Sequence, residues 1–380
     1  MKTKIAVALF AVVLAGGLVA SAQSPNANSR GKECKRGAVF TVLPNGVDDT
    51  ANLQQAFDNA VAAGRGATVR LIAGTYHTRQ IVATNFQGAF RGAGAEQTVL
   101  TNLPNLPVLP NFNFSNPPSA ANPWPVLVAF VGGDFQVSDL GIRITGATPT
   151  TGWSVPGAPT TQELSGGLYV LGTRANAILS RICVEGEPAQ NTYYGYNLTN
   201  GIYFEGCIGE WPWAPISGSF IVRDSTFRHM GCGAPTFNVS DAFILISCNH
   251  FIDNGYDSSE GFGLLNSTFE YSFNTVEGGF YGLDIVDAPD VVAQVSQTTS
   301  SRLLIRNNVF NGCQDGLFID TTFVSDSECL VVGNDFRQVA DTGIYLGAGT
   351  SDCVVKGNTP TTIVNLGTDN VIENGGHGRR

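Results

Sequence analysis

The sequence predicts an all-β solenoid that begins with a helical cap, and three observations carry this prediction. Glycine is frequent, with 45 of 380 residues, while charged residues make up only 14% of the chain. Short apolar runs bounded by Gly, Asn, Asp or Pro recur along the second half of the chain at intervals near 24 residues. One segment near the start shows the apolar spacing of an amphipathic helix. Together these features favour many stacked coils of short strands.

The first 22 residues have the pattern of a cleaved export signal. Lys2 and Lys4 precede an apolar run from Ile5 to Ala20, and Ala20-Ser21-Ala22 forms a small-x-small cleavage site. A membrane anchor is the alternative, although the run is short and contains Gly16-Gly17. We therefore predict a secreted or periplasmic protein with no integral membrane segment after signal removal. Residues 23–37 would form a linker.

The net charge argues against two classes of partner. It is −10 for the whole chain, and loss of Lys2 and Lys4 with the leader makes it −12. A nucleic-acid-binding protein would show a basic patch, and binding to anionic lipid would need clustered basic residues. We expect a monomer whose partner is a polysaccharide rather than a nucleic acid.

A helix is predicted over residues 51–63, after a cap at Asp49 or Thr50 and before Gly64. The apolar positions at helical spacing are Leu53, Ala56, Phe57, Ala60 and Val61. A solenoid needs a cap over its first open coil, and this amphipathic helix is the candidate.

Two strand patterns repeat after the helix. The first carries an Asn or Ser at positions 225, 249, 274, 308, 334 and 358, at intervals of 24, 25, 34, 26 and 24 residues. Such short intervals suit coils stacked about 4.8 Å apart and exclude propeller blades of roughly 40–45 residues. We expect the Asn side chains to form a hydrogen-bonded ladder at a bend, where Asn also tolerates left-handed backbone.

The second pattern is a Gly followed by alternating apolar residues. It directs Leu168, Ile202, Leu283, Leu317 and Ile344 inward, and Tyr169, Tyr203, Asp284, Phe318 and Tyr345 outward. Glu205 and Asp320 follow two residues later on the same face. Outward aromatic residues beside carboxylates are typical of a saccharide-binding surface, although a solvated acidic face is the simpler interpretation.

Asp284 and Asp320 are the leading candidates for acid and base, with Glu205 and His229 as further catalytic candidates. One coil and two strand residues separate the two aspartates, so their backbones should lie roughly 8 Å apart. Inverting glycosidases place their two carboxyl groups at about 6.5–9.5 Å.

Insertions between coils supply further binding candidates. Trp211 and Trp213 are expected to contact sugar together with the outward aromatic residues. Asp287 and Asp290, close to Asp284 in the sequence, could hold a calcium ion.

The opening of the chain resembles pectin-lyase-like right-handed parallel β-helix proteins. The matching elements are Asp49-Thr50, Leu53-Gln54-Gln55-Ala56, Thr68-Val69, Ala73-Gly74-Thr75-Tyr76, Gly92-Ala93-Gly94, Thr98-Val99-Leu100 and Val137-Ser138-Asp139-Leu140-Gly141-Ile142. The resemblance implies a β-helix domain over 38–375, followed by a flexible tail at 376–380. Lyases, hydrolases, epimerases and binding proteins share this scaffold.

The resemblance leaves two functions open. The first is an exported carbohydrate-active protein that cleaves a polysaccharide as a hydrolase or lyase, in a groove on the Gly-headed strand face. The second is a non-catalytic cell-surface or polysaccharide-binding β-helix. The full Asn-Thr-Asp, Asp-Asp, His-Gly and Arg-x-Lys set of the polygalacturonases is absent from the sequence.

The eight cysteines all follow the leader, and two of them share one position in consecutive coils. Cys329 and Cys353 each stand five residues before a repeated Asn. Equivalent Cα atoms of stacked coils lie about 4.8 Å apart, a spacing that permits a disulfide in an exported protein. Stacked buried thiols are the alternative.

Overall fold

The computed structural model describes residues 37–103, 126–144, 165–186, 199–205, 215–230, 234–286, 301–321, 329–359 and 361–373. The predicted leader at 1–22, most of the linker and the tail at 376–380 lie outside these residues. No helix within the described ranges has the length and apolar character needed to cross a membrane.

Helix α1 (Thr50–Ala63) packs against the first strands, at the N-terminal end of the solenoid. Leu53, Ala56, Phe57 and Ala60 are buried, and Gly64 ends the helix at a φ of 80°. The ring of Phe57 lies 5.0 Å from that of Phe90, inside the first coils. The predicted capping helix is confirmed. Asp49 precedes it, but its carboxylate accepts hydrogen bonds from the backbone of Asn45 and His77 instead of capping the helix.

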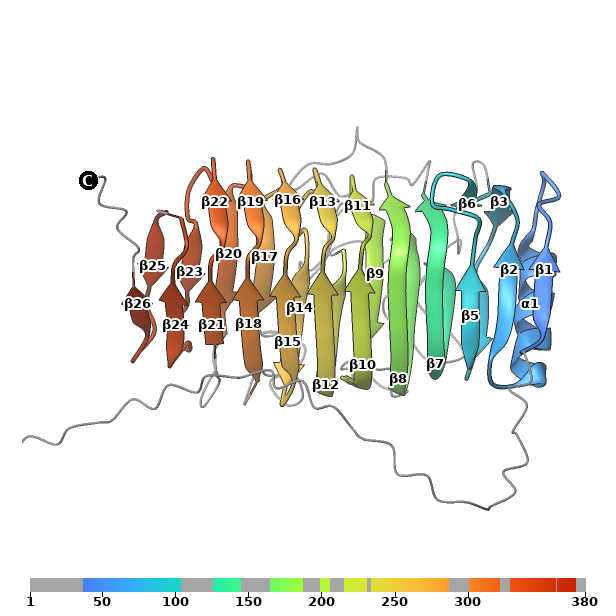
Figure 1. The fold of residues 1–380 in the computed structure, drawn as a ribbon, viewed down its shortest axis with the longest axis horizontal. Coiled ribbons are helices and arrows are strands. Elements are labelled where there is room, and N and C mark those ends of the chain that lie inside the picture. The colour runs from blue at the N-terminus through green and yellow to red at the C-terminus, as the bar shows by residue number, and fades with distance from the viewer. Residues whose placement is uncertain are drawn as a thin grey trace, which may run out of the picture. The chain divides into compact units, whose positions relative to one another are not determined.

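The strands form three parallel sheets, A, B and C, which run along the solenoid (Figure 1). Sheet A contains β1 (Val39–Val42), β2 (Ala67–Leu71), β5 (Gly88–Arg91), β10 (Ile216–Arg223), β15 (Thr268–Ser272), β18 (Arg302–Arg306), β21 (Cys329–Val332), β24 (Cys353–Lys356) and β26 (Val371–Glu373). Sheet B contains β3 (Gly74–Thr78), β6 (Thr98–Asn102), β11 (Thr226–Arg228), β13 (His250–Ile252), β16 (Thr275–Glu277), β19 (Val309–Asn311) and β22 (Asp335–Arg337).

Sheet C contains β4 (Ile81–Thr84), β9 (Thr199–Glu205), β14 (Glu260–Leu265), β17 (Tyr281–Val286), β20 (Asp315–Asp320), β23 (Ile344–Leu346) and β25 (Ile363–Asn365). Strands β7 (Val126–Arg143) and β8 (Ser165–Glu185) bend through all three sheets, and β12 (Thr236–Ser247) runs through sheets C and A. The chain visits C, A and B in turn, and the fold is a right-handed parallel β-helix, as predicted.

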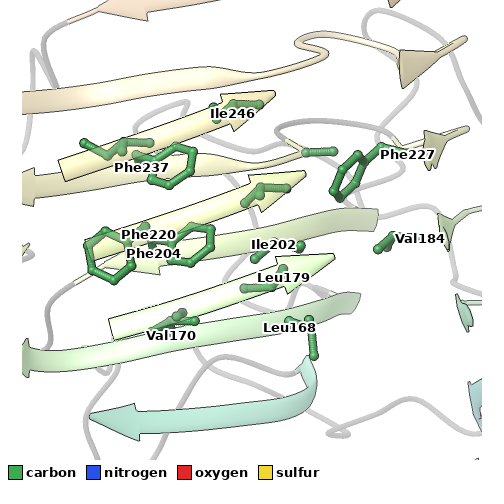
Figure 2. Packing of buried hydrophobic residues seen from close by; sticks show 14 of the residues in the cluster. Leu168, Val170, Leu179, Val184, Ile202, Phe204, Phe220, Phe227, Phe237 and Ile246 are labelled. Atoms are coloured by element: carbon green, nitrogen blue, oxygen red, sulfur yellow. The ribbon is translucent and has the colours of Figure 1, made fainter. Parts of the chain in front are cut away.

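The core lies between the three sheets and consists of stacked apolar side chains. Figure 2 shows part of it, with Leu168, Ile202, Phe204 and Phe237 directed into the interior. The rings of Phe204 and Phe237, from neighbouring coils, are 4.6 Å apart and parallel within 2°. The five residues predicted to point inward are all buried: Leu168, Ile202, Leu283, Leu317 and Ile344. The alternation read from the sequence is therefore confirmed on sheet C.

The predicted Asn ladder lies at the bend between sheets A and B. The backbone N–H and Nδ2 of Asn274 both donate to Oδ1 of Asn308, at 2.9 and 3.1 Å. Asn308 donates in the same way to Oδ1 of Asn334, at 3.0 and 2.9 Å. These side chains are buried, so each ladder bond satisfies a donor that water does not reach.

The left-handed residue at this bend is the one before the Asn. Phe273 and Asn307 have φ values of 58° and 54°, and Gly333 occupies the same place at 65°. The expectation that Asn itself takes the left-handed backbone is wrong here, because its side chain is used for the ladder while its neighbour turns the chain.

Cys329 and Cys353 are paired in register on β21 and β24, as the repeat predicts. Both are buried free thiols in the structure, and they are hydrogen-bonded to each other. The stacked-thiol alternative is thus the arrangement present, and the disulfide is not.

Differential alkylation checks this arrangement. Without reductant, we expect native protein to be labelled at the exposed Cys248, while Cys183, Cys313, Cys329 and Cys353 react only after denaturation. Burial raises the pKa of the Cys313 thiol to about 12, which further suppresses its native reactivity. Recovery of a peptide pair linked through Cys329 and Cys353 by mass spectrometry would contradict the prediction.

Candidate active site on sheet C

The outward positions of sheet C form one row in register along the solenoid. We refer to this set as the outward row: Val82, Ala129, Tyr169, Tyr203, Thr236, Glu260, Asp284, Phe318, Tyr345 and Val364. The predicted outward positions Tyr169, Tyr203, Asp284, Phe318 and Tyr345 all belong to it. Thr236 and Glu260, which the sequence pattern did not identify, fill the two coils between Tyr203 and Asp284.

The N-terminal part of the row is covered. Tyr169 is fully buried, and so is Ala129 on the preceding coil. The expectation that Tyr169 presents an exposed ring to substrate is therefore wrong, because outward direction in a coil does not ensure access to solvent. Tyr203 and Glu205 lie on β9 at the expected register, but their side chains are outside what the structure describes. Trp211 and Trp213 are also outside the described residues.

Three carboxyl groups meet at the middle of the row. Asp257, Glu260 and Asp284 each offer a carboxylate oxygen, and these atoms all lie within 4.8 Å of one another. Glu260 and Asp284 are directly paired between β14 and β17, while Asp257 precedes β14 and forms a β-bridge with Tyr281. Asp257 is fully buried, Asp284 is 3% exposed and Glu260 is half-buried. We call these three residues the carboxyl cluster.

Burial and mutual repulsion favour the protonated form of the cluster. Burial raises the pKa of Glu260 to about 7, although the Thr236 hydroxyl, which donates to its Oε2 at 3.2 Å, acts in the opposite direction. Burial also raises the pKa of Asp284 well above its ordinary range, and the charges of Glu260 and Asp320 add to this. A hydrogen bond with Asp257 partly offsets the rise in the pKa of Asp284. The cluster thus retains protons near neutral pH.

The raised pKa of Glu260 predicts how stability depends on pH. Stability gained from the protonated form is present below pH 4.5 and is lost as the pH rises through about 7. At 1.36 kcal/mol per pKa unit, the loss is about 3 kcal/mol at most. Urea unfolding at pH 5 and pH 8 should show this loss in the wild type and a smaller one in Glu260→Gln. The exposed Glu373 of β26 provides the control, Glu373→Gln, and equal losses in wild type and Glu260→Gln would contradict the prediction.

Asp320 stands one coil further on and two residues along the strand. Its backbone pairs with Val286, while Asp284 pairs with Phe318, which is the offset predicted from the sequence. Asp320 is exposed, and its charge acts on the pKa of Asp284. The pairing of these two aspartates as acid and base stays a prediction.

His229 occupies a different part of the coil. It follows β11 of sheet B in a left-handed turn with a φ of 57°, and its backbone N–H donates to Ile252. Its catalytic role also stays a prediction.

A divalent cation is compatible with the chemistry of the carboxyl cluster. Calcium prefers carboxylate and carbonyl oxygens, and the cluster supplies three carboxylate oxygens on two neighbouring coils. Asp257, Glu260 and Asp284 would then be the ligands. The predicted ligands Asp287 and Asp290 lie outside the described residues, and their role stays a prediction.

Aromatic side chains border the cluster on its C-terminal side. The rings of Tyr281 and Phe318 are 4.9 Å apart, and those of Phe318 and Tyr345 are 4.4 Å apart and nearly parallel. Tyr256 and Phe280 continue this contact, with Phe280 4.5 Å from Tyr281. We call the five residues the aromatic strip, and all of them are half-buried. Since Phe318 and Tyr345 stack on each other, part of each ring face is not available to a ligand. The strip therefore offers less aromatic surface than a flat platform would.

Comparison with known proteins supports the fold over most of the chain. Residues 190–360 match the family model for a right-handed beta helix region. No curated protein sequence matches the chain. Among solved structures, the chain is similar to polygalacturonase from Erwinia carotovora ssp. carotovora, with a TM-score of 0.50, 13% identity, and coverage of 89% of this chain and 96% of that one.

A phage tailspike has a similar fold. The Dettilon tailspike protein matches with a TM-score of 0.53 and 14% identity, over 84% of this chain. The chain spans about half the length of that tailspike, 54% of it. These similarities and the strand arrangement establish a right-handed β-helix fold, which the sequence resemblance implied.

Proposed function

We propose that this β-helix is an exported carbohydrate-active protein that hydrolyses a glycosidic bond of a polysaccharide on sheet C. The observation that carries the proposal is the carboxyl cluster, in which the pKa of Glu260 is raised to about 7. Glycoside hydrolysis needs a carboxylic acid that still holds its proton at the working pH, together with a second, ionised carboxylate.

The proposed reaction assigns the proton donor to the coupled pair Glu260 and Asp284, and the base to Asp320. The pair transfers a proton to the glycosidic oxygen as its bond to the anomeric carbon breaks. Asp320 accepts a proton from the water molecule whose oxygen forms the new bond to that carbon. The offset of one coil and two strand residues supports this assignment, because it separates the two backbones by roughly 8 Å, and inverting enzymes hold their two carboxyl groups about 6.5–9.5 Å apart. Asp257 would act as a positioning residue through its hydrogen bond with Asp284.

The comparison supports the substrate class without determining it. A polygalacturonase of the same fold is covered over 96% of its length, so this scaffold can carry polysaccharide hydrolysis. The predicted leader at 1–22 supports export to the outside of the cytoplasm, where polysaccharide substrates occur. A non-catalytic polysaccharide-binding protein is the second candidate, because the half-buried aromatic strip would suit either role.

An assay of polysaccharide cleavage tests the proposal. The purified protein is incubated with a panel of plant and bacterial polysaccharides, and reducing ends and unsaturated products are measured separately. We expect new reducing ends without unsaturated products, and no loss of turnover in EDTA. Unsaturated products would indicate a lyase instead. Activity that disappears in EDTA and returns with calcium would assign the cluster to a cation. Retention of a polysaccharide without any cleavage would favour the binding protein.

A further inference from the structure

All charged residues in the described strands of sheet C, which carries the carboxyl cluster, are acidic. The described strand segments of sheet C include no Lys, Arg or His, and their acidic residues are Glu205, Glu260, Asp284, Asp315 and Asp320. Sheet C therefore supplies no cation of its own to a ligand.

Several basic residues on sheets A and B are paired with carboxylates. Arg306 on β18 contacts Glu270 at 2.8 Å, and Arg181 contacts Asp139 at 2.6 Å. Glu185, at the end of β8, lies between Arg143 and Arg228. In the described coils, sheets A and B thus carry residues of both charges, whereas the strands of sheet C carry no basic residue beside their carboxylates.

This distribution penalises an anionic substrate. Two unit charges of the same sign repel by about 4 kcal/mol at 4 Å under an effective dielectric constant near 20. A polyuronate carries one carboxylate on each sugar, and a carboxylate placed beside the exposed Asp320 would meet this repulsion with no cation on the described strands of sheet C to offset it. Carboxylates can instead accept hydrogen bonds from the hydroxyl groups of an uncharged sugar.

The aromatic strip is also suited to an uncharged ligand. Tyr281, Phe318 and Tyr345 present ring surface on three successive coils directly beside Asp284. Contacts of this kind gain energy from the apolar C–H surface of a sugar and need no charge on it.

We propose that the polysaccharide bound at sheet C is an uncharged, hydroxyl-rich glycan, and that the aromatic strip binds the part of it that extends toward the C-terminal coils. This inference rests on the proposed function and narrows it to a substrate class.

Binding measured on a variant without turnover tests the proposal. Asp284→Asn is titrated by calorimetry with dextran, laminarin and arabinogalactan as uncharged glycans, with polygalacturonate and alginate as anionic ones, and with chitosan as a cationic one. We expect the tightest binding to an uncharged glycan. Its affinity should change little between 10 and 150 mM salt, because salt screens interactions between charges and this ligand carries none. Phe318→Ala and Tyr345→Ala should each weaken it about 5- to 10-fold. The matched control is Phe273→Ala, because Phe273 is 50% exposed and lies at the bend between sheets A and B.

The outcomes separate this inference from the proposed hydrolysis. Tightest binding to polygalacturonate, alginate or chitosan, or binding to none of the panel, would overturn the inference. Cleavage of polygalacturonate by the wild type would overturn it while leaving hydrolysis intact. Binding of an uncharged glycan that the wild type never cleaves would leave the ligand class standing and remove the hydrolysis. Val364→Lys, which adds a cation to the outward row beside Tyr345, should raise affinity for polygalacturonate selectively.

Discussion

Asp284→Asn is expected to lower kcat by about 10³-fold while leaving the thermal midpoint unchanged or slightly raised. General acid–base groups contribute roughly 10²- to 10⁴-fold to rates, so loss of the proton donor removes most of the catalysis. Stability should survive because Asp284 is buried and its pKa is raised well above the ordinary range, so the folded protein already favours the neutral form of this carboxyl. Asn is a neutral side chain of nearly the same shape. Turnover is measured with the polysaccharide that gives the most reducing ends.

Three further variants show whether the cluster acts as a unit. Glu260→Gln should also lower kcat strongly and shift the upper limb of the pH–rate profile, since its pKa of about 7 is close to the working pH. Asp320→Asn should lower kcat at all pH values, while Glu277→Gln on sheet B should leave it unchanged. Full activity in both Asp284→Asn and Asp320→Asn would remove the assignment. A large fall in the thermal midpoint of Asp284→Asn would show that the carboxyl has a structural role instead.

The coil repeat could be read from the sequence because the same physical demand recurs in every coil. Each turn between sheets A and B must satisfy a buried backbone donor, and Asn308, Asn334 and Asn358 do so with the same side-chain oxygen, Oδ1. Leu283 and Leu317 fill equivalent inward positions for the same reason. A requirement that repeats at fixed spacing leaves a visible pattern, so fold, phase and ladder were all predictable.

The carboxyl cluster was only partly predictable, because two of its members break the repeat. Asp284 follows a Gly by two residues, as the pattern requires. Glu260 instead precedes Gly261, so its pairing with Asp284 does not follow the position of the Gly. A bulge between Phe237 and Val239 displaces the pattern on the neighbouring strand β12. Asp257 lies before β14, where no strand pattern applies. The one available signal was local: Asp257 and Glu260 share a short segment rich in Ser and Gly.

Access to solvent was the other feature that periodicity could not supply. Tyr169 and Tyr345 belong to the same outward row, yet Tyr169 is fully buried and Tyr345 is half-buried. Alternation along a strand determines which side of the sheet a side chain occupies. What covers that side depends on contacts between distant segments, and the sequence pattern carries no record of them. The raised pKa values of Glu260 and Asp284 arise from burial and were hidden for the same reason.

Asn308→Ala should lower the free energy of unfolding by about 3–5 kcal/mol, the largest stability effect expected from a single ladder substitution. The Asn308 side chain accepts two hydrogen bonds from Asn274 and donates to the carbonyl of Tyr271 and to Asn334, each at 2.9–3.1 Å. Alanine leaves these buried groups unsatisfied, and each unpaired buried group costs roughly 1–3 kcal/mol. Urea unfolding at fixed pH measures the change.

Two comparison variants separate the ladder from a general intolerance to change. Asn308→Ser should fall between wild type and alanine, because Ser225 holds the equivalent position and its Oγ accepts a hydrogen bond from Ile182. Asn59→Ala on α1 removes one exposed hydrogen bond from Gln55 and should change stability by less than about 0.5 kcal/mol. If Asn308→Ala were no more harmful than Asn59→Ala, water would have to reach the bend, and the ladder would not be what stabilises stacking of the C-terminal coils. If serine were as harmful as alanine, the two bonds donated by Asn308 would account for the stabilisation, and the acceptor role of its Oδ1 would be minor.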